Sequence, residues 1–316
     1  MKILVTGVSG FIGGRIAAAL ARRHEVWGVY RTTRLKHLES NHGLTLIQDD
    51  LGCPTRLPDS CDFVVHAAAD TPGTTKDGLR HWKSNRDGMQ HLLEWSRTAG
   101  ISRFMFFSTM DVYGSIGQAC IDENTSPAQP NSYGASKLAA EQLLEEHSQK
   151  NADIRCITVR LPGVVGKEAH GTFLPRMVQN IFSGVPTVVY QKQSLFNNVV
   201  YIGNIIKFAS DWSESSQHKG YTMFNAASEC PIPLQKVIGV LAENFGRGCV
   251  VEENAQGRPP FLIATDLAKR SGFPIVSTQA SLSAYAQEVL SAQQPIEETA
   301  AVPLGHGHSA IESIAD

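Results

Sequence analysis

Tyr133 and Lys137 are the residues whose types and spacing most directly indicate chemistry. On a helix, residues four positions apart lie on one face, so the phenol and the ammonium are expected to be neighbours. A nearby cation stabilises a phenolate and lowers the pKa of the phenol. Such a tyrosine takes a proton from an alcohol, or returns one to a carbonyl, near neutral pH. Taken alone, the pattern is more typical of a half-buried tyrosine beside a solvated lysine.

A glycine-rich turn near the N-terminus makes the catalytic interpretation more specific. Residues 2–5 form an apolar run expected to be a strand, Gly7, Gly10 and Gly13 follow, and residues 16–20 begin a helix. In such a turn one glycine allows the tight bend, one lets the backbone approach a pyrophosphate, and one packs helix against strand. The N–H groups at the helix N-terminus also favour phosphates. The order of strand, turn and helix therefore predicts a dinucleotide site.

Together, Gly7-x-x-Gly10-x-x-Gly13 and Tyr133-x-x-x-Lys137 resemble the extended short-chain dehydrogenase/reductase family, the group that holds sugar-nucleotide epimerases and dehydratases. Residues 62–69 resemble the fourth strand of that family and its following turn. Residues 107–114 resemble the fifth-strand segment that supplies a catalytic hydroxyl. The resemblance spans roughly residues 1 to 290.

The resemblance implies an α/β fold, a doubly wound parallel (Rossmann) sheet with a smaller C-terminal substrate lobe. We expect a dinucleotide-binding domain over residues 1–165, whose sheet receives later strands, and a mixed α/β substrate lobe over 166–292. Residues 293–316 mix Gln, Pro, Gly, His and Glu without an apolar period, which predicts a mobile tail. Two histidines in that tail do not make a metal site, and no metal is expected.

The resemblance also assigns roles near the tyrosine. Thr109 falls where the family has a hydroxyl that donates to the substrate carbonyl and shares a proton with Tyr133. Lys137 is expected to hold the ribose hydroxyls as well. The 4,6-dehydratases of the family resemble Thr-Asp-Glu at positions 109 to 111, whereas this chain has Met110, which argues against β-elimination. Asp111 fits either an acid/base group beside a ketone or an aspartate that bonds its own loop.

The end of the second expected strand bears on the choice of cofactor. An acidic residue there bonds the adenosine 2′-hydroxyl, and an arginine accepts a 2′-phosphate. This chain has Tyr30 followed by Arg31 and Arg34, so NADP is expected in preference to NAD, although a solvated basic loop has the same composition. The residues expected to bind the cofactor are Gly7, Ser9, Gly10, Phe11, Ile12, Gly13, Arg31, Arg34, Asp50, Leu51, Ala67, Ala68, Ala69, Asn85, Ser108, Tyr133, Lys137, Leu161, Pro162 and Val164.

Two departures fall where sugar-nucleotide enzymes of the family bind the diphosphate. Gly163 replaces an asparagine and Asn197 replaces an arginine, so charge would have to come from Arg176, Lys192 or Arg258. The leading hypothesis is a sugar-nucleotide epimerase or 4-keto reductase. The alternative is an NADPH-dependent reductase or dehydrogenase of a carbonyl or hydroxyl compound without a nucleotide. A third is a non-catalytic NAD(P)-sensing protein, which the intact threonine, tyrosine and lysine argue against.

Composition limits the partners. With 28 basic and 30 acidic residues the net charge is -2, which indicates neither nucleic acid nor an anionic membrane as a partner. No apolar run is long enough to span a bilayer, and the N-terminus is expected to be a strand and not a signal peptide. Six cysteines without a Cys-x-x-Cys pair are typical of reduced thiols in a cytoplasmic protein. A homodimer is expected through helices over residues 79–99 and 131–150.

Overall fold

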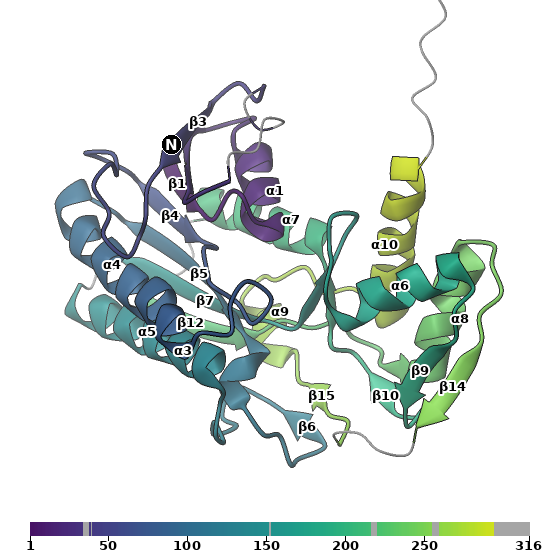
Figure 1. The fold of residues 1–316 in the computed structure, drawn as a ribbon. Coiled ribbons are helices and arrows are strands. Elements are labelled where there is room, and N and C mark those ends of the chain that lie inside the picture. Colours follow the sequence, from purple (N-terminus) through teal and green to yellow (C-terminus); the bar gives the residue numbers. More distant parts are fainter. Residues whose placement is uncertain (34–37, 39, 152, 216–219, 255–258, 294–316) are drawn as a thin grey trace, which may run out of the picture.

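A seven-stranded parallel sheet forms the centre of the computed structural model, which describes residues 1–33, 38, 40–151, 153–215, 220–254 and 259–293 (Figure 1). The strand order is β12-β7-β5-β4-β1-β2-β3, and every pairing is parallel. This confirms the predicted doubly wound sheet. Its strands are β1 (Lys2–Thr6), β2 (Glu25–Tyr30), β3 (Leu44–Gln48), β4 (Phe63–His66), β5 (Arg103–Thr109), β7 (Arg155–Leu161) and β12 (Gly220–Asn225).

Helices cover both faces of the sheet, which is why its central strands are continuously apolar. On one face α1 (Phe11–Leu20) and α7 (Ile202–Glu214) pack against the strands through side chains such as Ile16 and Phe208. On the other face α4 (Gly88–Ala99) and α5 (Ser132–Lys150) lie side by side and bury residues such as Leu92 and Leu144 (Figure 1). All four residues of β4 are buried between these layers.

The helix predicted over residues 79–99 has a different geometry at its start. It comprises α3 (Gly78–His81), a π-helical segment η1 (Trp82–Asp87) and then α4. Its successor α5 is regular, and the Asn131 side chain accepts a hydrogen bond from the Gly134 N–H at 2.8 Å. Asn131 is therefore the N-cap of this helix.

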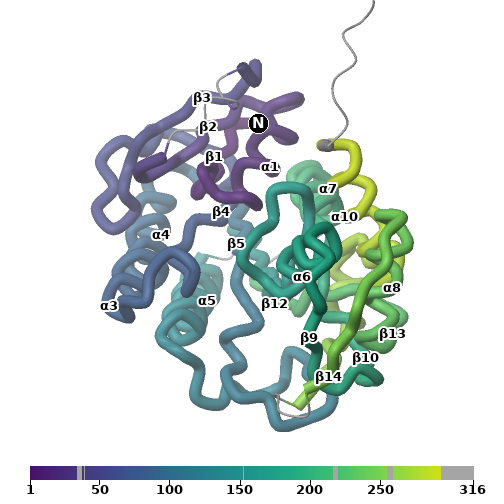
Figure 2. The backbone as a smooth tube through the Cα atoms, turned by 45° about the vertical axis from the view of Figure 1, so that its right-hand side comes forward, coloured from purple at the N-terminus to yellow at the C-terminus, as the bar shows by residue number. Residues whose placement is uncertain are grey.

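The later part of the chain forms a second lobe with its own core, seen on the right of Figure 1 and in front in Figure 2. Short strands pair there as β8 with β11, β9 with β14 and β10 with β13. The helices and strands of this lobe are β8 (Gly163–Val165), α6 (Phe173–Ser183), β9 (Thr187–Tyr190), β10 (Leu195–Phe196), β11 (Val199–Tyr201), β13 (Ile232–Pro233), α8 (Leu234–Asn244), β14 (Val251–Asn254) and α10 (Thr278–Gln293).

Connections run between the two lobes in both directions. β12 follows much of the second lobe in sequence yet joins the edge of the main sheet beside β7. β6 (Cys120–Ile121) pairs with β15 (Leu262–Ile263), while α9 (Asp266–Arg270) follows β15. The domain boundaries at residues 165 and 292 remain a prediction. The tail over 294–316 lies outside the described residues. Within the described residues, no helix is long and apolar enough to cross a membrane.

Candidate active site

The glycine turn between β1 and α1 is shaped for close approach to a ligand. Gly7 has φ +74°, and a Cβ on it would lie 2.7 Å from the backbone of Ala68. A Cβ on Gly13 would lie 2.4 Å from the Gly7 carbonyl oxygen, so only glycine lets the helix sit so close to the turn. Gly10 is the N-cap of α1 and has no side-chain cap bond. The N–H groups of the first turn are thus left for an anion.

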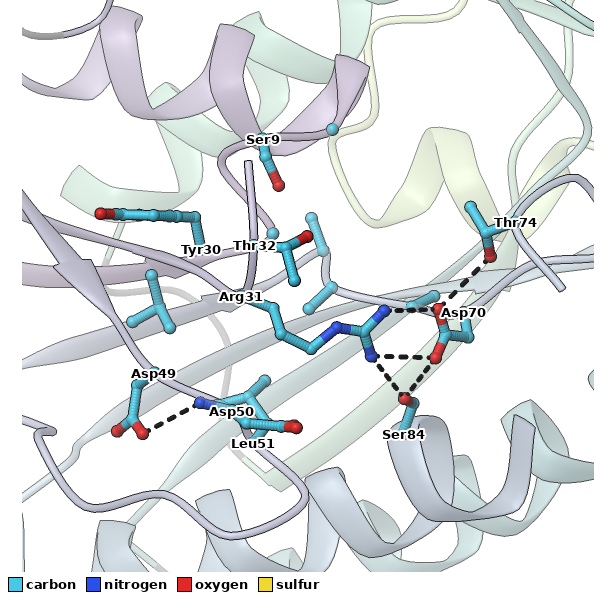
Figure 3. A pocket seen from close by; sticks show the side chains of 16 residues that line it. Ser9, Tyr30, Arg31, Thr32, Asp49, Asp50, Leu51, Asp70, Thr74 and Ser84 are labelled. Atoms are coloured by element: carbon cyan, nitrogen blue, oxygen red, sulfur yellow. Dashed lines mark hydrogen bonds and ion pairs between the residues drawn. The ribbon is translucent and has the colours of Figure 1, made fainter. Parts of the chain in front are cut away.

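A cavity of about 280 Å³ opens beside this turn, at the carboxyl ends of the strands, and we call it the glycine-turn cavity (Figure 3). It lies where strand order reverses about β1, which is where ligands bind in doubly wound sheets. Several residues predicted to bind a cofactor line it, namely Gly7, Ser9, Gly10, Arg31, Asp50, Leu51, Ala67, Ala68 and Ala69. Asp70, Thr74 and Ser84 also line it, and no sequence motif had pointed to them.

Arg31 is bound to the wall of this cavity. Its two terminal nitrogens donate to the two carboxylate oxygens of Asp70, each at 2.9 Å, and one also donates to the Ser84 hydroxyl at 3.1 Å (Figure 3). The Arg31 side chain is 36% exposed, whereas that of Asp70 is 1% exposed. Arg34, its predicted companion, lies outside the described residues.

Asn85 acts behind the cavity rather than in it. Its amide oxygen accepts from the Asp70 N–H at 2.9 Å, and its amide nitrogen donates to the Asp70 carbonyl at 3.0 Å and to the Ser136 hydroxyl at 3.0 Å. The side chain is 1% exposed. Asn85 therefore fixes the backbone of Asp70 and ties it to α5.

Tyr133 and Lys137 lie on α5 as predicted, and Thr109 ends β5 beside them. Tyr133 shares a hydrogen bond with Thr109, and its ring packs edge-on against His81 at 5.8 Å. Burial, followed by the charge of Asp111, raises the pKa of Tyr133 to about 12, and the Thr109 bond opposes this. The expected lowering of the tyrosine pKa by the lysine is thus absent from this structure, because burial outweighs every other influence on the phenol.

Lys137 is deeply buried at 2% exposure. Its Nζ donates to the Phe107 carbonyl at 2.7 Å and lies 4.1 Å from the centre of the Phe106 ring. Burial lowers its pKa to about 7, and the nearby Glu141 carboxylate opposes the change. An ammonium with this pKa gains or loses its proton close to neutral pH.

A buried ion pair supports the lysine from one turn further along α5. The Arg160 guanidinium donates to Glu141 at 2.6 Å through one terminal nitrogen and to the Tyr113 hydroxyl at 2.8 Å through the other. Tyr113 in turn donates to Asn225 on β12. The side chains of Arg160 and Glu141 are 6% and 4% exposed. The pair therefore joins α5, β7 and the edge strand β12 behind the reactive residues.

A second cavity of about 380 Å³, here the Thr109 cavity, opens between the main sheet and the second lobe. Its walls are mainly apolar, and no Lys, Arg or His among the described residues lines it. Predicted cofactor residues Leu161 and Pro162 contribute to it, as does Asp111. Its lining is Thr109, Met110, Asp111, Leu161, Pro162, Gly163, Val165, Thr172, Phe173, Leu174, Phe196, Asn198 and Phe261.

Lys192 and Arg176, two of the cations considered for a diphosphate, do not line the Thr109 cavity. Lys192 pairs with Glu253 at 3.2 Å, Arg176 is exposed on α6, and Arg258 lies outside the described residues. Asn197 is 4% exposed, and its amide binds the backbone of Ser228 and Ile263. Asn197 therefore has a structural role at the position where an arginine is expected in sugar-nucleotide enzymes of the family.

The remaining predicted cofactor residues, Phe11, Ile12, Val164 and Ser108, line neither of the two cavities. Phe11 and Ile12 begin α1 and pack partly buried against the core beneath it. Val164 lies on β8 in the same partly buried layer. The Ser108 hydroxyl is buried and has no hydrogen-bond partner among the described residues.

The glycine turn, the sheet and the Tyr133–Lys137 helix together define a dinucleotide-binding enzyme of the extended short-chain dehydrogenase/reductase type. A family model described as the NAD dependent epimerase/dehydratase family matches residues 3–213, and the chain belongs to that family. The predicted family resemblance is confirmed. The glycine cradle and the N–H donors at the start of α1, which has no side-chain cap, fit the pyrophosphate of NAD(P).

Curated relatives agree with this assignment. An uncharacterized UDP-glucose epimerase of Bacillus subtilis is 28% identical over 226 residues, which cover 66% of this chain and 71% of its own length. A GDP-6-deoxy-D-mannose reductase of Pseudomonas aeruginosa is 30% identical over 210 residues, which cover 65% of this chain and 64% of its own length. The aligned segments thus span roughly two thirds of these relatives.

A solved structure confirms the fold over nearly the whole chain. The UDP-glucuronic acid 4-epimerase from Bacillus cereus, solved in complex with NAD, superimposes with a TM-score of 0.79 at 24% identity. The superposition covers 93% of this chain and 98% of that one.

Proposed function

We propose that this chain is an NAD(P)-dependent epimerase or 4-keto reductase of a sugar nucleotide. The observation that carries the proposal is the bond between Tyr133 and Thr109 at the edge of the Thr109 cavity, with buried Lys137 one turn along the same helix. The relatives described above, which are named for UDP-sugar and GDP-sugar substrates, support the substrate class.

The proposed roles follow from these contacts. Thr109 donates a hydrogen bond to the substrate oxygen, and Tyr133 gives or takes the proton at that oxygen. Lys137 holds the ribose hydroxyls and supplies positive charge behind the phenol. When bound, the nicotinamide supplies or accepts the hydride. With its pKa raised to about 12, Tyr133 is protonated at neutral pH and poised to donate to a carbonyl, which is the reductive direction.

Asp111 is proposed as the second acid/base group if the reaction epimerises a carbon next to a ketone. It lines the Thr109 cavity, two residues after the threonine. Its backbone N–H donates to the Thr109 hydroxyl at 3.2 Å, a bond that does not involve the carboxylate and therefore leaves both roles of the side chain open.

One observation favours the alternative substrate class, a carbonyl or hydroxyl compound without a nucleotide. The described lining of the Thr109 cavity contains Phe173, Phe196 and Phe261 and offers a diphosphate no cation. An apolar wall of this kind favours an apolar substrate body.

A cofactor-release assay and a substrate screen test the proposal. The purified protein is denatured, the supernatant is assayed for nicotinamide dinucleotides, and UDP- and GDP-sugars are screened for isomerisation beside ketones with NADPH. Isomerisation with retained cofactor supports an epimerase, and oxidation of NADPH by ketones alone supports the second class. Activity that survives Tyr133→Phe unchanged would refute both and leave the sensing protein.

We also propose NADP as the preferred cofactor, because Tyr30 occupies the place of an acid and Arg31 lines the glycine-turn cavity. A cytoplasmic location and a homodimer are proposed as well. The described structure supports the dimer through exposed apolar side chains at the predicted interface, Leu79 at 81% and Trp82 at 41% exposure. All six cysteines are free in the structure.

A further inference from the structure

Asp70 is the most heavily bonded carboxylate in the glycine-turn cavity, and the proposed chemistry does not use it. Besides the two bonds from Arg31, it accepts from the Ser84 hydroxyl at 2.6 Å (Figure 3). It also accepts from Arg80 Nε at 3.0 Å. The Thr74 hydroxyl donates to it at 3.4 Å. These donors hold the pKa of Asp70 well below its usual range, although burial opposes them. The group is therefore a permanent anion in the cavity wall.

The carboxylate is also the fixed member of the Arg31–Asp70 pair. Asn85 binds both the N–H and the carbonyl of Asp70, and Asn85 is itself buried and bonded to α5. Arg31, in contrast, lies in the loop after β2, and its long side chain is partly exposed. If the pair separates, the guanidinium is the group that moves.

Separation of the pair does not leave the Asp70 carboxylate without partners. Asp70 keeps Arg80 and Ser84 as partners when Arg31 leaves, so no unpaired charge is buried. Arg31 in turn can leave only for an acceptor that replaces both carboxylate oxygens. A phosphate dianion offers that two-point acceptor, and a ribose hydroxyl does not.

We propose that Asp70 is a specificity-determining residue for the cofactor: it competes with the adenosine 2′-phosphate for Arg31 and so lowers the affinity for NADP(H) relative to NAD(H). This rests on the proposed function only in requiring that NAD(P) binds in the glycine-turn cavity. NAD(H) leaves the Arg31–Asp70 pair intact. NADP(H) has to break it, and part of the gain from phosphate binding is lost.

Binding titrations of NADPH and NADH to the full-length protein test the proposal. The variant Asp70→Asn keeps the shape of the side chain and removes its charge. The dissociation constant for NADH divided by that for NADPH is expected to rise on the order of tenfold, because NADPH binds more tightly. That factor is about the value of one charge-assisted hydrogen bond. Asp70→Ser tests the same point if the first variant does not fold. Folding is checked by thermal melting and by an NADH dissociation constant close to that of the wild type.

Two further variants separate competition from general loosening. In an Arg31→Met background, Asp70→Asn should leave the ratio of the NADH and NADPH dissociation constants unchanged, because the guanidinium for which Asp70 and the phosphate compete is gone. Arg80→Gln removes the other cation on Asp70, so Asp70 should hold Arg31 at least as tightly and the ratio should not move toward NADPH. A rise in NADPH preference in Arg80→Gln, or persistence of the Asp70→Asn effect without Arg31, would overturn the proposal.

The wild type distinguishes this inference from the proposed function. If it binds either cofactor but Asp70→Asn leaves the ratio unchanged, the role of Asp70 is wrong and the proposed function stands. If the wild type binds neither cofactor, both are overturned.

Discussion

Replacing Lys137 with Met should stabilise the fold while it abolishes activity. The ammonium is buried, and desolvation lowers its pKa from an ordinary 10.5 to about 7. That difference corresponds to about 5 kcal/mol between the two protonation states, of which about 4 kcal/mol opposes folding at pH 7. Methionine fills similar space without charge but loses the bond to the Phe107 carbonyl, a loss of about 1–2 kcal/mol. We expect a net gain of about 2 kcal/mol in unfolding free energy.

The lowered pKa of Lys137 also determines how the stability difference between the wild type and Lys137→Met changes with pH. Because the folded-state pKa is lowered, the unfolded chain binds more protons between about pH 7 and 10.5, so the wild-type stability rises with pH across that window. Lys137→Met lacks this contribution. Its advantage should be largest at or below pH 7, shrink as pH rises and disappear toward pH 10.

Urea unfolding at several pH values between 6.5 and 9.5 measures the difference. Lys150→Met is the matched control, because that lysine ends the same helix with its side chain 66% exposed. Its effect should stay within about 0.5 kcal/mol at every pH. A Lys137→Met protein that is less stable than wild type at pH 6.5, or whose advantage does not change with pH, would refute the reasoning about the buried ammonium.

Three other changes have defined outcomes. Tyr133→Phe removes only the hydroxyl that bonds Thr109, so turnover should fall at least about 100-fold while the cofactor dissociation constant stays within about threefold; equal losses of both would point to misfolding. Glu141→Gln leaves the Arg160 guanidinium buried without its anion, which should cost about 3–5 kcal/mol in urea unfolding, and a loss under 1 kcal/mol would show that water reaches the pair. Gly13→Ala places a Cβ 2.4 Å from the Gly7 carbonyl, so calorimetry should find cofactor binding lost; unchanged affinity would contradict the close packing of the turn.

The sequence predicted those parts of the site that depend on local patterns. The strand–turn–helix order around Gly7 and the spacing of Tyr133 and Lys137 each lie within a few residues, and hydrophobic periodicity sets the helices and strands that carry them. The parallel sheet was predicted from the family resemblance, and its buried strands, such as β4, agree with it. These elements appear in the structure where they were expected.

The charge pairs could not be predicted in the same way. Arg31 and Asp70 are 39 residues apart, and only the adjacency of strand ends in the sheet brings them together. The sequence placed Arg31 at the end of the second strand but gave no sign of its partner Asp70. The pKa of Tyr133 was predicted in the wrong direction, because spacing shows that a cation is near and says nothing of the burial that opposes ionisation.

The π-helical segment η1 affects how this chain can be compared with others and altered. A π turn contains one residue more than an α turn, so η1 behaves as an insertion stored inside a helix. Deleting one residue there would turn the π turn into an α turn and leave α3 and α4 in the same relative orientation, whereas a deletion elsewhere in the helix would rotate its two parts by about 100°. An alignment with a chain whose corresponding helix is α-helical throughout therefore needs a one-residue gap within residues 82–87, and grafts of this helix should keep its length.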